Sequence, residues 1–423
     1  MKKTFRWNPY ADQPHNVAPK GERFRHHLKH LPSYFNLAHA NLRKAFPIIR
    51  FYRIYKKEMY KRPVQLEDPF ALSFTSSEED NANILECLAE LDIKKCLIRI
   101  PSWKRASLDE YEKDVSFFAR QGQEITISLL QQRDDIKFPA RWAVFLEEVF
   151  TRFRKTCCYF ELGHAWNRTK WGVWNYKEYL QLAEAALPYT EKSDIQIIGP
   201  AVIDFEFHLY PPVMKKIPFE KITSLLYVDR TGAPENPQFG WDLPRKIALL
   251  KAIIDSSQPQ KKDLWITELN WPLEGTGKYS PAPGKSSVSE SKQADYLVRY
   301  YVWSLASGFI QRIYWWQLAA PGYGLVDNRG KTWRKRPSYH AFKTMIPILR
   351  NSLFKHKMQD TRALIFHFNK NEKQFAVCWT NHEPFDYSFS EGISYVKGRD
   401  GKDMPYNNST IRLNSSPQYV FFK

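Results

Sequence analysis

Several carboxylates, amides and tryptophans of this chain come directly after short apolar runs. The stretch 265–272 reads Trp-Ile-Thr-Glu-Leu-Asn-Trp-Pro, so Glu268, Asn270 and Trp271 follow an apolar run at its carboxyl end. A second such run ends with Trp315, Trp316 and Gln317. Aromatic rings stack on the apolar faces of sugars, while amides and carboxylates bond to sugar hydroxyl groups. These stretches therefore predict a carbohydrate site.

The apolar runs alternate with helical patterns between residues 68 and 350. Eight runs rich in β-branched and aromatic residues are the expected strands: 70–74, 96–100, 124–129, 157–162, 195–199, 222–228, 264–268 and 312–317. Helical patterns lie between them at 78–91, 108–121, 140–154, 176–187, 243–256 and 289–307. Such alternation is typical of parallel βα units, and eight units predict a (β/α)8 TIM barrel. A doubly wound open sheet is the alternative, but no Gly-rich fingerprint follows the first expected strand.

The carboxyl ends of the strands carry the active site in a (β/α)8 barrel. The expected strand ends add Arg99 and Trp103 after the second strand, residues 161–168 after the fourth and Tyr227 after the sixth. Side chains alternate along a strand, so only one of the two tryptophans Trp315 and Trp316 is expected to face inward.

Three stretches give the chain a resemblance to a known family. Residues 265–272 look like the nucleophile strand of retaining glycoside hydrolases with a (β/α)8 barrel, and the nearest group is β-xylosidase-like. The run Tyr314-Trp-Trp-Gln317, with Tyr323-Gly-Leu-Val-Asp327 and Arg336-Pro-Ser-Tyr339 after it, is similar to the family's last strand, loop and eighth helix. Ile198-Gly-Pro-Ala201 is similar to its fifth strand. The resemblance covers about residues 68–350. It implies that Glu268 is the nucleophile, with Tyr227 beside it and Arg99 keeping it ionised.

The fourth strand departs from the family pattern. That pattern is close to Glu-Ile-Gly-Asn-Glu-Pro-Asn, in which the second Glu is the general acid/base, whereas residues 161–167 read Glu-Leu-Gly-His-Ala-Trp-Asn. Ala165 thus stands at the acid/base position, His164 replaces the Asn that bonds the sugar, and Asn167 is kept. An ideal strand would turn His164 to the face opposite Ala165. Retaining hydrolysis needs two carboxyl groups about 5–5.5 Å apart, and an alanine cannot donate the proton.

The missing proton donor has two expected substitutes, His164 and Glu206. The loop carboxylates Asp134, Asp135 and Asp229 are further options without a motif behind them. Glu161 precedes Ala165 by four residues, which would place it about 13 Å deeper, so a barrel-interior ion pair is its expected role.

Two functions remain open from the sequence. Glu268, the tryptophans of the last strand and Asn167 favour a glycoside hydrolase with an atypical acid/base. The joint change at positions 164 and 165 favours a glycan-binding barrel without turnover. In either case the expected partner is an oligosaccharide, polysaccharide or glycolipid, and no cofactor is expected.

A strongly basic segment precedes the barrel. Residues 1–63 carry a net charge of +12 of the chain's +18, which implies an anionic partner. Residues 1–33 are expected to be extended, and residues 34–62 predict an amphipathic helix with a break or kink near Pro47. That helix either lies on an anionic membrane surface or packs on the main domain with a solvated basic face. No nucleic-acid module is recognisable, and the histidines His26, His27 and His30 lack a neighbouring carboxylate or thiol, so no metal site is expected.

The remaining features set the expected domains and location. We expect a basic arm at 1–67, the barrel at 68–351 and an antiparallel β unit at 352–423, where short runs alternate with turn residues. Five cysteines without metal-type spacing indicate buried thiols in a reducing compartment. No apolar run is long enough for a transmembrane helix, and no apolar region follows the first lysines as in a signal peptide. These features favour a cytoplasmic protein, peripheral at the inner face of a membrane.

Overall fold

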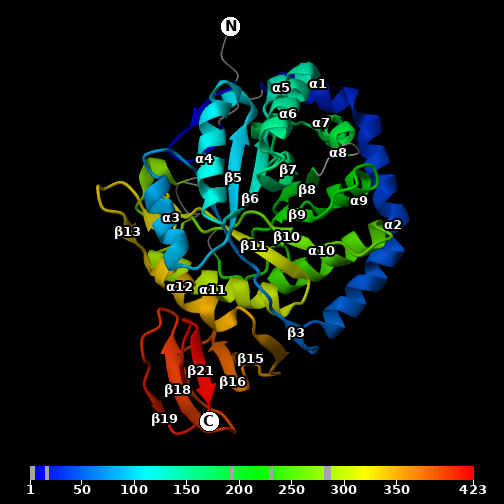
Figure 1. Cartoon of the computed structure of the whole chain (residues 1–423). Coiled ribbons are helices and arrows are strands. Elements are labelled where there is room, and N and C mark those ends of the chain that lie inside the picture. The colour runs from blue at the N-terminus through cyan, green and yellow to red at the C-terminus, as the bar shows by residue number, and fades with distance from the viewer. Residues whose placement is uncertain (1–4, 15–18, 191–194, 229–231, 281–286) are drawn as a thin grey trace.

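A closed barrel of parallel strands lies at the centre of the computed structural model, which describes residues 5–14, 19–190, 195–228, 232–280 and 287–423 (Figure 1). Its strands pair in chain order, and the last pairs with the first. They are β4 (Phe70–Phe74), β5 (Lys95–Pro101), β6 (Glu124–Leu130), β7 (Cys157–Leu162), β8 (Gln196–Ile203), β9 (Ile222–Leu225), β10 (Leu264–Ile266) and β11 (Ile310–Trp316). The predicted (β/α)8 barrel is confirmed, and its closure excludes the doubly wound sheet.

Helices surround this barrel (Figure 1). They are α3 (Asn81–Glu90), α4 (Leu108–Arg120), α5 (Arg133–Lys137), α6 (Pro139–Phe153), α7 (Tyr176–Glu184), α8 (Leu187–Thr190), α9 (Tyr210–Met214), α10 (Leu243–Ser257), α11 (Glu290–Ala306) and α12 (Pro337–Leu349). Helix α6 is an example of a helix with one buried apolar face. Its residues Trp142, Phe145, Val149 and Phe153 recur at helical spacing and are all buried. Burial of this one apolar face holds such a helix against the strands.

Three strands end two to four residues away from their predicted ends. β8 continues to Ile203 through a register shift between Gly199 and Val202, four residues beyond the predicted end. β9 ends at Leu225 and β10 at Ile266, so Tyr227 and Glu268 lie in the loops that follow these strands. After β9 the apolar residues continue through Val228, so composition alone does not mark where its pairing stops.

The carboxyl-terminal part is antiparallel, as predicted. A six-stranded sheet has the order β18-β21-β16-β15-β14-β3, and a three-stranded sheet has the order β17-β20-β19. Their strands are β14 (Leu353–Lys357), β15 (Leu364–Lys370), β16 (Lys373–Trp379), β17 (Phe385–Ser388), β18 (Ile393–Gly398), β19 (Tyr406–Asn407), β20 (Thr410–Leu413) and β21 (Gln418–Phe422). The first sheet also takes in β3 (Val64–Gln65), which precedes the barrel. A short hairpin, β12 (Val326–Asp327) and β13 (Arg334–Lys335), lies in the loop after β11.

The amino-terminal segment is folded rather than extended, so that prediction is wrong for its described residues. β1 (Trp7–Asn8) pairs with β2 (Gln13–Pro14) in a hairpin, and α1 (Lys20–Lys29) precedes α2 (Leu31–Glu58). The His26 side chain is only 11% exposed, and its Nε2 lies 3.6 Å from Glu178 Oε1. In Figure 1 helix α1 lies at the end of the barrel opposite the carboxyl-terminal sheets.

Helix α2 packs along the side of the barrel and continues through Pro47, so the predicted break is absent (Figure 1). Lys44 Nζ donates to Ser256 O at 2.8 Å, and the Tyr55 hydroxyl donates to Asp255 Oδ2 at 2.5 Å. These contacts flank the proline on both sides along the helix. Packing against α10 therefore outweighs the one backbone hydrogen bond that a proline removes.

The opposite face of α2 is exposed and apolar. Phe35, Leu42 and Phe46 are 73%, 73% and 79% exposed, and Leu31 and Ile49 continue the row. Their spacing of three, four or seven residues places them on one stripe of a helix. Exposed basic side chains border this outer stripe: Arg43, Arg50, Arg53 and Lys57. No helix among the described residues is both long and apolar enough to cross a membrane.

The cysteines differ in part from the expectation of buried thiols. Cys87, Cys96, Cys157 and Cys378 are buried, but Cys158 is exposed. Neighbouring residues of a strand point to opposite faces, so the Cys157-Cys158 pair cannot be buried on one side.

Candidate active site

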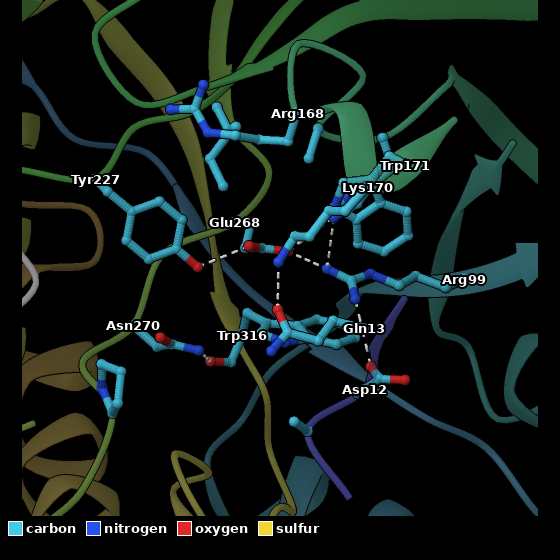
Figure 2. A pocket seen from close by; sticks show the side chains of 15 residues that line it. Asp12, Gln13, Arg99, Arg168, Lys170, Trp171, Tyr227, Glu268, Asn270 and Trp316 are labelled. Carbon is cyan, nitrogen blue, oxygen red and sulfur yellow. Dashed lines mark hydrogen bonds and ion pairs between the residues drawn. The ribbon is translucent and has the colours of Figure 1, made fainter. Parts of the chain in front are cut away.

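A pocket opens at the carboxyl ends of the barrel strands, and Glu268 lies within it (Figure 2). Its volume is about 110 Å³. The lining residues come from strand ends, loops and the amino-terminal hairpin: Ala11, Asp12, Gln13, Arg99, His164, Ala165, Arg168, Lys170, Trp171, Ile203, Tyr227, Glu268, Asn270, Pro272 and Trp316. The pocket thus lies at the carboxyl ends of the barrel strands, where the sequence predicts the active site.

Glu268 is held by three side chains from three different strand ends. Arg99 Nη2 donates to its Oε2, and the Tyr227 hydroxyl donates to Oε1 at 2.7 Å. His164 Nε2 lies 3.3 Å from Oε2. The carboxylate is only 7% exposed, so it is fixed and largely shielded from solvent.

Electrostatics keep Glu268 ionised. Burial alone would raise the pKa of this carboxyl, but the Arg99 guanidinium, His164 and the Tyr227 hydrogen bond outweigh burial and lower the pKa to about 2. Near neutral pH the group is therefore a carboxylate. A buried carboxylate of this kind is able to attack an electrophilic carbon or to stabilise a developing positive charge.

His164 is neutral near pH 7. Burial, together with the charge of Arg99, lowers the pKa of its imidazole to about 4 although Glu268 opposes the shift. Its Nε2 also lies 3.1 Å from Arg99 Nη2. A neutral ring nitrogen either accepts from Arg99 or donates to Glu268, depending on its tautomer.

Arg99 links the floor of the pocket to the amino-terminal hairpin. Its guanidinium carbon stacks 3.3 Å from the centroid of the Trp316 ring. Its Nη1 donates to Asp12 Oδ2 at 3.3 Å, so the guanidinium lies between two carboxylates (Figure 2). The peptide bond after Trp316 is cis.

The hairpin residues Asp12 and Gln13 were not among the predicted site residues. Gln317 Nε2 donates to Asp12 Oδ2 at 2.9 Å, and Lys170 Nζ donates to Gln13 Oε1 at 2.5 Å. The sequence offers one weak signal for this hairpin, because Asn8-Pro9 marks a turn between aromatic residues. Nothing in the sequence indicates that the turn reaches the barrel.

The loop after β7 brings His164 and Ala165 to the pocket together. β7 ends at Leu162, and Gly163 and Ala165 have φ of 77° and 42°. The predicted alternation of His164 and Ala165 onto opposite faces is wrong, because neither residue belongs to the strand. Gln131 fixes the loop, donating from Nε2 to His164 O at 3.0 Å and to Trp171 O at 3.2 Å.

Six predicted site residues lie outside the pocket lining. Trp103 packs on Trp7, with ring centroids 5.2 Å apart. Asn167 binds the backbone of Ile203, donating from Nδ2 and accepting at Oδ1 at 2.9 Å each. Gln317 contacts Asp12, as described above. The two tryptophans Trp271 and Trp315 stack on each other behind the pocket, and of the pair at 315 and 316 only Trp316 faces inward.

The sixth is Glu206, which forms an ion pair with Arg168 together with Asp204. Arg168 itself lines the pocket, whereas Glu206, whose side chain is 37% exposed, does not. Asp134 is half-buried on α5, Asp135 accepts a hydrogen bond from Ser102, and Asp229 lies outside the described residues.

Glu161 does not form the expected ion pair with any described residue. The Ser128 hydroxyl donates to its Oε2 at 2.9 Å inside the barrel, and burial raises the pKa of this carboxyl. A raised pKa reduces the charge that would have to be paired.

Comparison with known proteins supports the fold. No protein-family model and no curated protein sequence matches the chain. Among solved structures, a family 39 glycoside hydrolase from Bacteroides cellulosilyticus WH2 is similar, with a TM-score of 0.66, 16% identity, and coverage of 85% of this chain and 81% of that chain.

Two further solved structures are similar at lower scores. A GH30 endoxylanase from Clostridium papyrosolvens C71 has a TM-score of 0.56 at 12% identity, and covers 86% of this chain and 98% of its own. A GH51 arabinofuranosidase from Xanthomonas axonopodis pv. citri has a TM-score of 0.55 at 12% identity with the same coverage. At identities this low, the structural similarity shows a shared (β/α)8 barrel fold and nothing more. The chemistry has to be argued from the residues of the site.

Proposed function

We propose that the protein is a glycoside hydrolase-like protein that acts on a glycan, with Glu268 as nucleophile. The observation that carries the proposal is a buried carboxylate at the carboxyl end of the barrel, held ionised by Arg99 and Tyr227. Trp316 and Trp171 supply aromatic walls, and Asn270, Lys170 and Arg168 supply polar groups for sugar hydroxyls. The substrate class is an oligosaccharide, a polysaccharide or a glycolipid.

A glycan-binding barrel without turnover is the second candidate. Ala165 lines the pocket at the position where the resemblance places the acid/base. A pocket without an acid at that position favours binding over hydrolysis.

Covalent trapping separates the two candidates. We expect 2,4-dinitrophenyl 2-deoxy-2-fluoroglycosides, whose leaving group needs no protonation, to label wild-type protein at Glu268, with labelling abolished in Glu268→Gln. The matched control is Glu274→Gln, an exposed carboxylate in the same loop, which should label normally. Ala165→Glu should speed turnover of unactivated glycosides. Glycan binding without any labelling would leave the binding barrel as the function.

We also propose that the outer stripe of α2 attaches the protein to an anionic membrane surface at the cytoplasmic face. Exposed Phe35, Leu42 and Phe46 flanked by arginines match a helix that lies in the lipid interface. Acidic headgroups complement the +12 charge of residues 1–63.

Vesicle flotation tests this attachment. Wild type should float with vesicles that contain phosphatidylglycerol and not with pure phosphatidylcholine, and Leu42→Ser/Phe46→Ser should lose the binding. Phe239→Ser removes another exposed apolar residue and is the control. Point substitutions are preferable to a deletion of residues 1–63, because the deletion would also remove the hairpin of β1 and β2. Equal flotation of the double variant and wild type would refute the attachment.

A further inference from the structure

The amino-terminal hairpin brings a second carboxylate into the pocket. Asp12 and Glu268 are the carboxylates among the described lining residues. One nitrogen of Arg99 bonds to Asp12 and the other to Glu268, so a single guanidinium group separates the two carboxyl groups. Ala165, on the loop after β7, ends at its β-carbon and supplies no carboxyl group to the pocket.

We propose that Asp12 performs the proton transfer for which the fourth strand of this barrel lacks a carboxyl group. The proposal rests on the function proposed above, and assigns the general acid/base to a segment outside the barrel. The hairpin would then be part of the active site rather than a cover over it.

The hairpin is positioned by contacts on several sides. Trp7 packs against Trp103 and Trp171, with ring centroids 5.2 and 6.2 Å away. Tyr10 packs edge-on against Tyr279 at 5.5 Å. Asn8 Oδ1 accepts from the backbone nitrogens of Tyr10 and Ala11 at 3.0 and 3.3 Å and closes the turn. Such contacts hold Asp12 in one place, as a proton donor requires.

The environment of Asp12 raises the pKa of its carboxyl group. Burial outweighs the opposing charge of Arg99 and the hydrogen bond from Gln317, and the nearby Glu268 carboxylate raises the pKa further. The two other candidates are less suited. His164 is neutral near pH 7, and Glu206 does not line the pocket.

The proposed reaction has two balanced steps. In the first, Glu268 attacks the anomeric carbon, the bond from that carbon to the leaving oxygen breaks with its electron pair, and Asp12 gives its proton to that oxygen. In the second, the Asp12 carboxylate takes a proton from water while the water oxygen attacks the anomeric carbon and releases Glu268. The net reaction is hydrolysis of the glycoside, and both carboxyl groups return to their starting states.

Leaving-group dependence tests the role of Asp12. The substrates are 2,4-dinitrophenyl and methyl glycosides of xylose, arabinose, glucose and galactose. In Asp12→Asn, trapping of Glu268 by the activated fluoroglycoside should stay near the wild-type rate, while turnover of methyl glycosides falls about 10²–10⁴-fold. Azide should speed turnover of the dinitrophenyl glycosides by Asp12→Ala, because this small anion needs no general base to attack.

Control variants separate proton transfer from hairpin placement. Asp12→Glu keeps the carboxyl group and should retain part of the methyl glycoside activity, whereas Trp7→Ala keeps Asp12 but weakens hairpin docking. Circular dichroism and the melting temperature check that each variant is folded. If Asp12→Asn lowers activated and unactivated turnover equally, or if His164→Gln or Glu206→Gln shows the expected pattern instead, Asp12 is not the acid/base. If wild-type protein is never labelled, the proposed function itself fails.

Discussion

The Arg99 guanidinium determines the charge of the candidate nucleophile. Glu268 is buried, and burial by itself raises the pKa of its carboxyl group. Arg99 opposes this effect most strongly and, together with His164 and Tyr227, lowers the pKa to about 2, so the carboxylate is charged over the whole range in which the protein would work. Arg99 therefore acts through Glu268 as a positioning and charge-setting residue.

Replacing Arg99 by glutamine should raise the pKa of Glu268, because burial is then opposed only by His164 and the Tyr227 hydrogen bond. A carboxyl group is charged above its pKa, so covalent labelling of Arg99→Gln should be weaker at pH 4–5 than at pH 7 and recover as the pH rises. Wild type should label evenly across that range. Labelling rate against pH is the measurement, and Arg105→Gln, in an exposed ion pair with Glu148, is the control. Identical profiles for wild type and Arg99→Gln would contradict the role assigned to Arg99.

Site residues were predictable where they follow a strand and not where they come from a distant segment. Apolar runs locate the strand ends, and active-site residues follow strand ends in a (β/α)8 barrel. This made it possible to predict four of the residues that line the pocket: Glu268, Arg99, Tyr227 and Trp316. Asp12 lies 87 residues before Arg99, and only tertiary packing brings it to the barrel. Whether a carboxylate at a strand end is a nucleophile is a matter of contacts, which one sequence does not contain.

Gln131 holds the loop that carries His164 and Trp171. Its buried amide makes three hydrogen bonds to the backbone of this loop, two as donor and one as acceptor from His164 N at 2.9 Å. Each buried backbone group that loses its partner costs about 1–3 kcal/mol.

Gln131→Leu should therefore lower the free energy of unfolding by several kcal/mol and slow the labelling of Glu268, since His164 would no longer be fixed beside it. Urea unfolding and the labelling rate are the two measurements. Gln121→Leu, at an exposed position after α4, should change neither. A Gln131→Leu protein with wild-type stability would show that other contacts hold this loop.

Elements were predicted best where apolar spacing is regular and least well where packing decides. β7 matches the predicted 157–162, and α10 differs by one residue at its end. Helix α2 passes through Pro47 because α10 lies alongside it, which local propensity does not express. The hairpin of β1 and β2 is too short for a periodic signal, and contacts with Trp103 and Trp171 stabilise it.

The barrel and the carboxyl-terminal sheets share one core. Phe354, Phe366, Trp379 and Tyr419 belong to the same buried cluster as the barrel residues, and a second, smaller cluster lies within the carboxyl-terminal sheets. A continuous core couples the unfolding of its parts. The proposed division between residues 351 and 352 thus separates the barrel from the carboxyl-terminal strands along the chain, but it does not separate two cores. We expect a single unfolding transition in calorimetry.

Glu235 joins the parts of the molecule through a buried ion pair. Its carboxylate accepts hydrogen bonds from Arg299 and Trp303 on α11 and from Trp379 on β16, and the side chain of Arg299 is only 3% exposed. Glu235→Leu leaves that cation buried without its partner, which should cost about 3–5 kcal/mol of unfolding free energy in urea. Asp386→Asn, which breaks a pair with Arg412 whose side chains are 66% and 59% exposed, should cost at most about 1 kcal/mol. A separate early transition of the carboxyl-terminal sheets in wild-type protein would contradict the shared core, because two independent units would then be present.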